Sequence, residues 1–367
     1  MNASHRGRTR WLVLIGLVGG VFVLYTVVAL QWASTSLGCD YAAYHHAADR
    51  LRSGLLLYDA SVHSTGECGI FQYPPPFTLI VLPLTFLPLA AATWAWIVLM
   101  TGCFVLGVAL LPVGGGVRLM VLLIGGVSWP FQLGLRIGTV GPLLFLLSVL
   151  SWRWLERPVR LGAATGAGFL VKLQPVILVG WMVLTRRWRA VGAFAALVGG
   201  ASLAAALVGA GAWHEWFALL GRLSGSAYVV GTNGSVGAIA YFAGLGTPAA
   251  VAAQWGSTIL VLLVVAWASL RLGSEPSFLI AVVASQLVSP MIWDHYAIQL
   301  LLPIAWLLER RQWWILIVPL SQAWMLVALV PLSVYLAGYF VTLAGVAAVA
   351  WQVRQTSAAT PPLVAQS

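Results

Sequence analysis

The feature that most constrains the fold is a series of long apolar runs that carry no charge and are bounded by arginine clusters. The first run, residues 11–31, follows Arg6, Arg8 and Arg10. About 20 apolar residues are enough to cross the ~30 Å hydrocarbon core of a bilayer, whereas the apolar part of a cleaved signal peptide has roughly 7–15 residues. The run therefore predicts an uncleaved membrane anchor whose N-terminus lies in the cytoplasm.

The composition of the whole chain leads to the same class of protein. Of the 367 residues, 61% are hydrophobic and 8% are charged, whereas soluble domains have about 25% charged residues. A soluble core of this size cannot bury so much apolar side chain, so lipid must surround part of it. The composition therefore excludes a soluble enzyme and predicts an all-α polytopic membrane protein.

The net charge of +10 would suggest nucleic acid as the partner of a soluble protein. Here the basic residues lie in short clusters beside apolar runs, and no nucleic-acid motif accompanies them. Such clusters are typical of the cytoplasmic ends of membrane spans. The partners expected from charge are therefore membrane lipids, with no nucleic acid.

The apolar runs predict about ten spans plus short re-entrant or interfacial helices. The spans are expected at residues 11–31, 75–89, 92–112, 140–155, 190–210, 248–270, 276–290, 296–308, 312–331 and 334–351. This arrangement places both termini and 13 of the 19 Lys and Arg residues in the cytoplasm of a multi-pass cell-membrane protein, as the positive-inside rule requires. Residues 1–354 then form one transmembrane domain, the tail 355–367 is expected to be disordered, and the stretch 112–135 is left unassigned.

One segment departs from the simple alternation of spans. Residues 161–185 are too short for two crossings and have arginines at both ends, which favours a hairpin of two half-helices that enters the membrane and returns. Its turn, residues 171–175, contains Lys172, the only lysine in the chain. Because a lysine at membrane depth usually faces a partner or an aqueous cavity, we expect Lys172 to bind a lipid phosphate. Snorkelling of Lys172 towards the interface is the alternative.

Two polar loops, residues 32–74 and 211–247, are expected on the extracytoplasmic side. Within the first, residues 41–53 have the pattern of an amphipathic helix at the membrane surface, with His45 among its polar residues. Cys39 and Cys68 also lie in this loop, where a disulfide and two free thiols are both open readings.

Asp40 follows the first span directly. A carboxylate at this boundary can accept a proton from a hydroxyl group, as a general base does. It can also serve as the N-cap of a helix that starts at Tyr41, a role that Asp fills well. The two roles are compatible, so both remain hypotheses.

Further candidate residues lie elsewhere in the chain. Trp293, Asp294 and His295 form a polar cluster between two apolar runs. There Asp294 could orient the imidazole of His295 or bind a diphosphate through a metal, and an ordinary solvated loop is the alternative. Arg136 is a second candidate phosphate ligand, since guanidinium binds phosphate oxygens in a bidentate way. The remaining candidates for contact with a substrate are Tyr44, His45, Tyr73 and Gln174.

Several short motifs, taken in their order along the chain, resemble glycosyltransferase family 87. They are Gly38-Cys39-Asp40-Tyr41-Ala42-Ala43-Tyr44 with Gly54 and Tyr58-Asp59, Tyr73-Pro74-Pro75-Pro76-Phe77, Lys172-Leu173-Gln174-Pro175 with the arginines that follow, and Ser289-Pro290 through Trp293, His295 and Tyr296. The resemblance extends from about residue 38 to residue 300. The chain departs from the family pattern at residues 138–141, where Gly-Thr-Val-Gly replaces Gly-Gln-x-Asn.

The resemblance implies a GT-C fold and a hexosyltransferase that works on the extracytoplasmic side. It implies a polyprenyl-phosphate-sugar donor, usually mannose, a lipid-linked or glycan acceptor, and Asp40 as the general base. In an inverting reaction of this kind Lys172, Arg136 or His295 would stabilise the leaving phosphate. An activated phosphodiester needs no nucleotide, so no cofactor is predicted, and a divalent metal stays an open alternative.

Two rival functions remain at this point. A transporter or flippase of lipid-linked saccharides predicts internal repeats and paired broken helices, whereas the sequence contains one broken hairpin and no clear repeat. An arabinosyltransferase or a polysaccharide ligase would be a related enzyme with a different donor, and the sequence separates it poorly from the first hypothesis.

Overall fold

The computed structural model describes residues 3–32, 36–59, 61, 70–209, 211–224 and 226–359. Within these residues the chain is helical, with one isolated β-bridge between Ser128 and Ala323. The α-helices are α1 (Ala3–Gln31), α2 (Cys39–Arg52), α3 (Phe77–Val81), α4 (Leu89–Leu110), α5 (Gly115–Gly126), α6 (Trp129–Ile137), α7 (Gly141–Arg153), α8 (Pro158–Val171), α9 (Val176–Leu184), α10 (Trp188–Val208), α11 (Ala212–Ser224), α12 (Val236–Ala240), α13 (Gly246–Arg271), α14 (Ser274–Leu287), α15 (Leu301–Glu309), α16 (Ile317–Ser321) and α17 (Leu332–Ala359). Short helices of other types are η1 (Leu82–Phe86), η2 (Ala227–Val229), η3 (Tyr241–Leu245), η4 (Asp294–Leu300), η5 (Trp313–Leu316) and η6 (Trp324–Leu329).

Five helices in the described part of the chain are long and apolar enough to cross a membrane, so the protein is an all-α polytopic membrane protein. They are Thr9–Gln31, Leu89–Leu110, Trp188–Ala206, Val236–Arg271 and Leu332–Thr356. Several other predicted spans form shorter helices. The helix α14 shows why a short helix is tolerated: every residue from Ser277 to Leu287 is buried, so protein surrounds the helix in place of lipid.

Two expectations about the spans need correction, and the unassigned stretch can now be described. Residues 312–331 form three short helices, η5, α16 and η6, and no single span. The run 75–89 contains α3 and η1, which together cover Phe77–Phe86, and ends at the first residue of α4. The unassigned stretch 112–135 holds α5 and most of α6, separated near Ser128, which precedes the Trp129-Pro130 start of α6. Proline suits the first turn of a helix and ends a preceding one.

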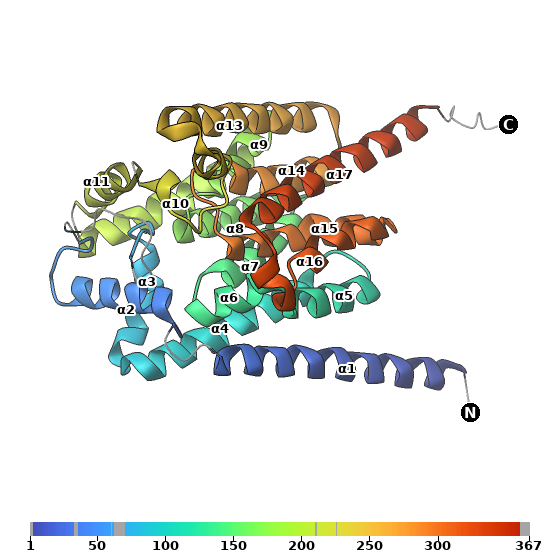
Figure 1. The fold of residues 1–367 in the computed structure, drawn as a ribbon, viewed down its shortest axis with the longest axis horizontal. Coiled ribbons are helices and arrows are strands. Elements are labelled where there is room, and N and C mark those ends of the chain that lie inside the picture. The colour runs from blue at the N-terminus through green and yellow to red at the C-terminus, as the bar shows by residue number, and fades with distance from the viewer. Residues whose placement is uncertain are drawn as a thin grey trace.

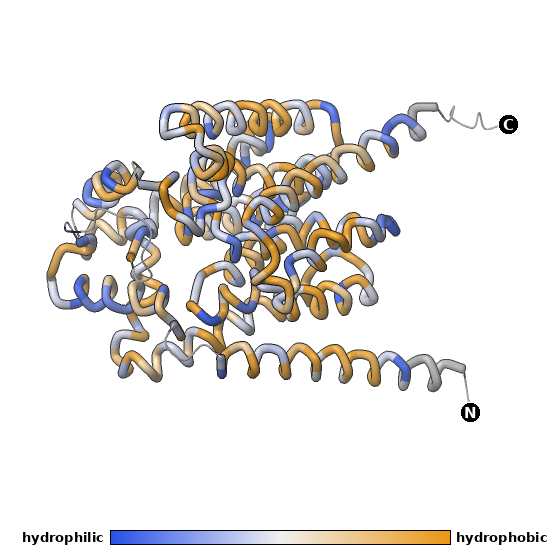
Figure 2. Tube along the Cα trace, in the orientation of Figure 1, coloured by the Kyte–Doolittle hydropathy of each residue, from blue (hydrophilic) through white to orange (hydrophobic). Residues whose placement is uncertain are grey.

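The elements lie along one main direction, with the polar loops at one end. The beginning of α1 and the end of α17 lie at the same end of the molecule, and α2, α3 and α11 lie at the opposite end (Figure 1). Hydrophilic residues gather towards both ends, while α1 is hydrophobic along most of its length (Figure 2). The helix α17 continues to Ala359, so the first residues of the expected tail are helical, and residues 360–367 lie outside the described residues.

The predicted break in the hairpin is confirmed. The helix α8 ends at Val171 and α9 begins at Val176. Lys172 has an extended backbone, with φ −156° and ψ 143°, and its N–H donates to the carbonyl of Gly168 over 2.8 Å. Pro175 has no N–H to donate and disfavours a helical conformation in the preceding residue, so α8 cannot run on through it.

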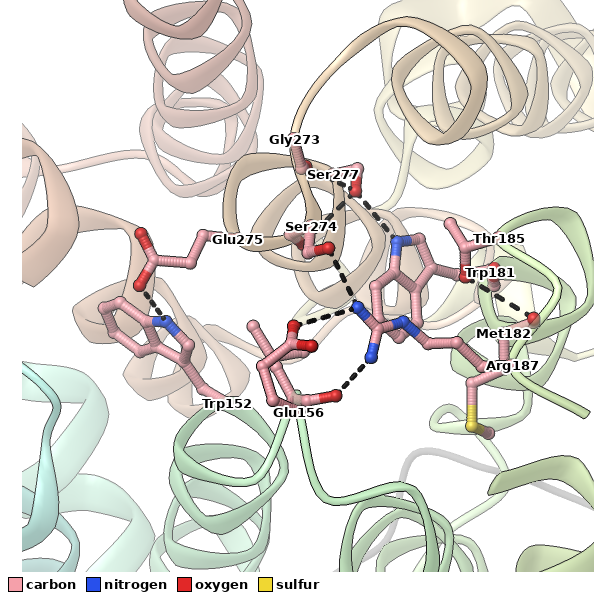
Figure 3. Close-up of polar contacts among 11 residues, drawn as sticks. Trp152, Glu156, Trp181, Met182, Thr185, Arg187, Gly273, Ser274, Glu275 and Ser277 are labelled. Carbon is pink, nitrogen blue, oxygen red and sulfur yellow. Dashed lines mark hydrogen bonds and ion pairs between the residues drawn. The ribbon is translucent and has the colours of Figure 1, made fainter. Parts of the chain in front are cut away.

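A cluster of polar contacts fixes the far end of this hairpin (Figure 3). Arg187 donates to Ser274 Oγ over 2.8 Å, pairs with Glu156 over 3.2 Å, and also donates to the carbonyl of Leu155. Trp181 Nε1 donates to Ser277 Oγ over 3.0 Å. These contacts join α9 and the α9–α10 turn to the start of α14, about 20 Å of helix away from Lys172.

The carboxylate of Glu275 extends the same cluster. It accepts from Trp152 Nε1, drawn in Figure 3, and from Trp306 Nε1, each over 3.2 Å. Arg310 pairs with it over 3.3 Å. One side chain thus connects α7, α14 and α15 at the end where the arginines gather.

Close packing of α8 against α10 gives a stability prediction. A methyl group at Gly162 would overlap the carbonyl oxygen of Ala190 and lie 2.9 Å from Ala193 Cβ. We expect Gly162→Ala to destabilise the protein by about 1–3 kcal/mol, the usual cost of overpacking. Thermal unfolding in detergent measures this. Gly180→Ala in α9 is the matched control, because no atom lies within 4 Å of its added methyl. Equal melting temperatures for the two variants would contradict the packing argument.

Candidate active site

A cavity of about 680 Å³ opens among α2, α6, α11, the break between α8 and α9, and the segment that follows α14. Polar side chains form one part of its wall: Asp40, Gln72, Tyr73, Lys172, Gln174, Asp294, His295 and Tyr296. Apolar side chains form another part, among them Leu133, Ile137, Leu173, Val176, Leu220, Leu223 and Val288. The cavity therefore offers both charged groups and an apolar surface that an acyl or prenyl chain can contact.

The cavity brings together most of the residues that the sequence predicts for a site. Asp40, Tyr73, Lys172, Gln174, Trp293, Asp294 and His295 all line it, although they come from three distant parts of the chain. Tyr44, His45 and Arg136 do not line it.

Asp40 lies in the first turn of α2, and Gly38 is the N-cap. The proposed capping role for Asp40 is therefore wrong, because the helix begins at Cys39, two residues earlier than expected. Gly38 takes a left-handed conformation, φ 68°, and donates its N–H to the carbonyl of Arg136 over 2.8 Å. A carboxylate in the first turn is favoured by the helix dipole, and α6 fixes the start of α2 beside the cavity.

Tyr73 is positioned by other residues of the same loop region. Its hydroxyl lies 2.7 Å from that of Tyr44, and its carbonyl accepts from the Tyr58 hydroxyl over 2.6 Å. Burial raises the pKa of the Tyr73 hydroxyl, and the negative charge of Asp40 raises it further. Tyr73 is therefore a neutral hydrogen-bonding group in the cavity wall, and its hydroxyl is held by that of Tyr44, which does not line the cavity.

The segment after α14 places three aromatic or charged groups on the wall. The rings of Trp293 and His295 are stacked, with centroids 6.4 Å apart and an angle of 11° between planes. The carboxylate of Asp294 accepts from Trp129 Nε1 over 2.6 Å and from the backbone N–H of His295 over 2.8 Å. Asp294 thus fixes the start of η4 and connects it to α6, in addition to lining the cavity.

The other two candidates lie away from the cavity. His45 is on the buried side of α2, 8% exposed, with its ring edge towards that of Tyr41. Its predicted place on the polar face of a surface helix is therefore wrong, because α2 packs against α3, η1 and α4 as well as facing outwards. Arg136 donates from Nε to Ser36 Oγ over 2.7 Å, beside the start of α2. Cys68 lies outside the described residues, so its pairing with Cys39 does too.

Two tryptophans that the sequence analysis does not name as site residues, Trp129 and Trp216, also line the cavity. Trp216 lies on α11, and its Nε1 donates to the carbonyl of Gln72 over 3.0 Å. The amphipathic spacing of Trp213, Trp216 and Leu220 was a usable signal for an inward-facing helix. Trp129 comes from the unassigned stretch, where the sequence carried no comparable pattern.

The model of glycosyltransferase family 87 matches residues 71–292. The chain belongs to glycosyltransferase family 87. It is a membrane glycosyltransferase, and the matched region contains all cavity residues named here except Asp40, Trp293, Asp294, His295 and Tyr296.

One curated protein similar to this family 87 member comes from Mycobacterium tuberculosis. It is the polyprenol-phosphate-mannose-dependent alpha-(1-2)-phosphatidylinositol mannoside mannosyltransferase, 25% identical over 327 residues, which cover 81% of this chain and 76% of that protein. No solved structure matches the chain.

Proposed function

We propose that this family 87 member transfers a mannosyl group from a polyprenyl-phosphate donor to a lipid-linked or glycan acceptor on the extracytoplasmic side of the cell membrane. The observation that carries the proposal is the meeting of Asp40 and Lys172 in one cavity that also has an apolar wall. The mannose donor is taken from the name of the mycobacterial relative.

In the proposed reaction the acceptor hydroxyl attacks the anomeric carbon of the donor sugar. Asp40 takes the hydroxyl proton as the new glycosidic bond forms, and the bond between the anomeric carbon and the phosphate oxygen breaks. Polyprenyl phosphate leaves with the bonding electrons, and attack from the opposite face inverts the anomeric configuration. Lys172, with His295 nearby, stabilises the negative charge that increases on the phosphate.

The absence of competing partners supports Lys172 in this role. In the described residues no carboxylate lies within ion-pair distance of its Nζ. The side chain nevertheless faces the cavity. The charge of Asp40 acts on the ammonium from beyond ion-pair distance. A half-buried ammonium with no carboxylate in direct contact favours an anionic ligand, and the donor phosphate is such a ligand.

A loss-of-function experiment tests the proposed function. Removing the protein from its native cells should cause one acceptor glycolipid to accumulate and its mannosylated product to disappear. Returning the wild-type chain should restore the product. Unchanged glycolipids and glycans in cells that lack the protein would contradict the proposal.

The proposed side of the reaction gives a topology prediction. Hydrogen bonds join Arg153 to the end of α4, Arg187 to the start of α14 and Arg354 to the end of α13, so arginines gather at one end, which we assign to the cytoplasm. A membrane-impermeant thiol reagent added to intact cells should label Ser61→Cys and Gly231→Cys, and should leave Arg157→Cys and Arg189→Cys unlabelled until the cells are opened. The reverse pattern would move the cavity to the cytoplasmic side.

A further inference from the structure

The ammonium of Lys172 lies against the faces of two tyrosine rings. Its Nζ is 3.6 Å from the ring centroid of Tyr296 and 5.7 Å from that of Tyr73. A cation within about 6 Å of an aromatic centroid is attracted to the negative face of the ring. The contact with Tyr296 is much the closer, so that ring contributes the larger attraction.

Little else fixes the end of this side chain. The backbone of Lys172 is held by its bond to Gly168, but a lysine ammonium lies at the end of a flexible four-carbon stem. In the described part of the chain no carboxylate pairs with it. The two ring faces are therefore the groups in contact with the ammonium, while the charge of Asp40 acts on it from beyond ion-pair distance.

The two rings are themselves fixed by separate parts of the chain. Tyr296 lies in η4, where its N–H donates to the carbonyl of Trp293 over 3.0 Å. Its ring meets the ring of His295 edge to face, 4.8 Å between centroids. Tyr73 is held by the hydroxyl of Tyr44. Both ring positions are thus set before any ligand binds.

We propose that Tyr296, with Tyr73 as the second wall, is a positioning residue that holds the Lys172 ammonium at the cavity by its ring face. A ring face attracts the charge but neutralises it far less than a carboxylate at ion-pair distance would. The N–H groups of Lys172 that point away from the rings then stay available to an anionic ligand. The catalytic part of this proposal rests on the proposed function, whereas the position of the ammonium does not.

The position of the ammonium can be measured without any substrate. Because Lys172 is the only lysine in the chain, protein labelled with ¹³C-lysine has one side-chain signal. Protons above an aromatic ring are shielded, so the ε-methylene signal of the wild-type protein should lie upfield of its position in free lysine. Tyr296→Leu should return it towards the free value, and Tyr296→Phe, which keeps the ring, should leave it upfield. An unshifted wild-type signal would contradict the proposed contact between the Lys172 ammonium and the Tyr296 ring.

Kinetics then test the consequence for the reaction. Tyr296→Leu should lower kcat/KM for polyprenyl-phosphate-mannose by roughly 10- to 30-fold, the size of a desolvated cation–π contact. Tyr296→Phe should recover activity to within about threefold of wild type. In a Lys172→Met background Tyr296→Leu should add little further loss, because its effect acts through the lysine. If Tyr296→Leu folds poorly, Tyr296→Met replaces it with a flexible side chain of similar length.

The outcomes distinguish the positioning role of Tyr296 from the proposed function. If Tyr296→Leu lowers kcat/KM equally in the wild-type and Lys172→Met backgrounds, Tyr296 does not act through Lys172. The positioning role of Tyr296 is then wrong, while the phosphate-binding role of Lys172 stands. An upfield lysine signal that Tyr296→Leu abolishes, with no effect of Lys172→Met on donor binding, would instead keep the contact and contradict the phosphate-binding role.

Discussion

Asp40→Asn is expected to reduce sugar transfer by roughly 10²–10⁴-fold, the usual contribution of a general base. The amide has nearly the same shape as the carboxylate and keeps its place in the first turn of α2. It cannot accept the proton of the acceptor hydroxyl. Folding and donor binding should therefore remain largely intact, so the loss should appear in turnover. Transfer rates, donor affinity and melting temperature measured on the same purified variant test this.

The same helix supplies a matched control for Asp40. Asp49 is an exposed carboxylate of α2 that pairs with Arg52 over 2.6 Å and does not line the cavity. Asp49→Asn removes an equal charge from α2 and should leave transfer close to wild type. Near-normal transfer by Asp40→Asn would contradict the role of Asp40 as general base. The carboxylate would then have only a structural role in the first turn of α2.

Lys172→Met is expected to lower both donor affinity and turnover. The donor phosphate is already anionic in the ground state and gains charge as it leaves, so a cation that binds it contributes to both steps. Removing one partner of a largely desolvated charge pair costs on the order of 3 kcal/mol or more, which corresponds to at least about 100-fold. Lys172→Arg should recover only part of the donor affinity and turnover, because the planar guanidinium presents its N–H donors differently from an ammonium.

A cation away from the cavity controls for the change in net charge. Arg118 donates from Nε to the carbonyl of Leu111 and does not line the cavity, so Arg118→Met should leave donor affinity unchanged. If Lys172→Met lowers the melting temperature but binds donor normally per folded molecule, the lysine is structural. Binding of a labelled polyprenyl-phosphate-sugar and thermal unfolding, measured together, decide between these outcomes.

Local sequence signals predicted the parts of the fold that depend on neighbouring residues. The long charge-free run predicted α1. Pro175 predicted the break that exposes Lys172, because proline affects helix geometry within one turn of its own position. The family resemblance placed Asp40 in the site. The predicted start of α2 was wrong by two residues because a left-handed glycine, Gly38, caps the helix in place of an acidic side chain.

The predictions that were wrong or missing concern contacts between residues far apart in the sequence. Nothing near Arg136 in the sequence shows that it donates to Ser36 rather than facing the cavity. His45 has polar neighbours on its helix, and only the packing of α2 on other helices buries it. The contact of Tyr296 with Lys172 joins positions more than a hundred residues apart, beyond the reach of any local pattern.

Transfer by the purified protein in liposomes tests the central claim most directly. The donor is polyprenyl-phosphate-mannose with a labelled sugar, and the lipid extract of the native cells supplies the acceptor. We predict one polyprenyl phosphate released for each labelled sugar that appears in the product, and no such release with Asp40→Asn. Movement of the intact donor lipid across the bilayer without cleavage would contradict the account and favour a transporter.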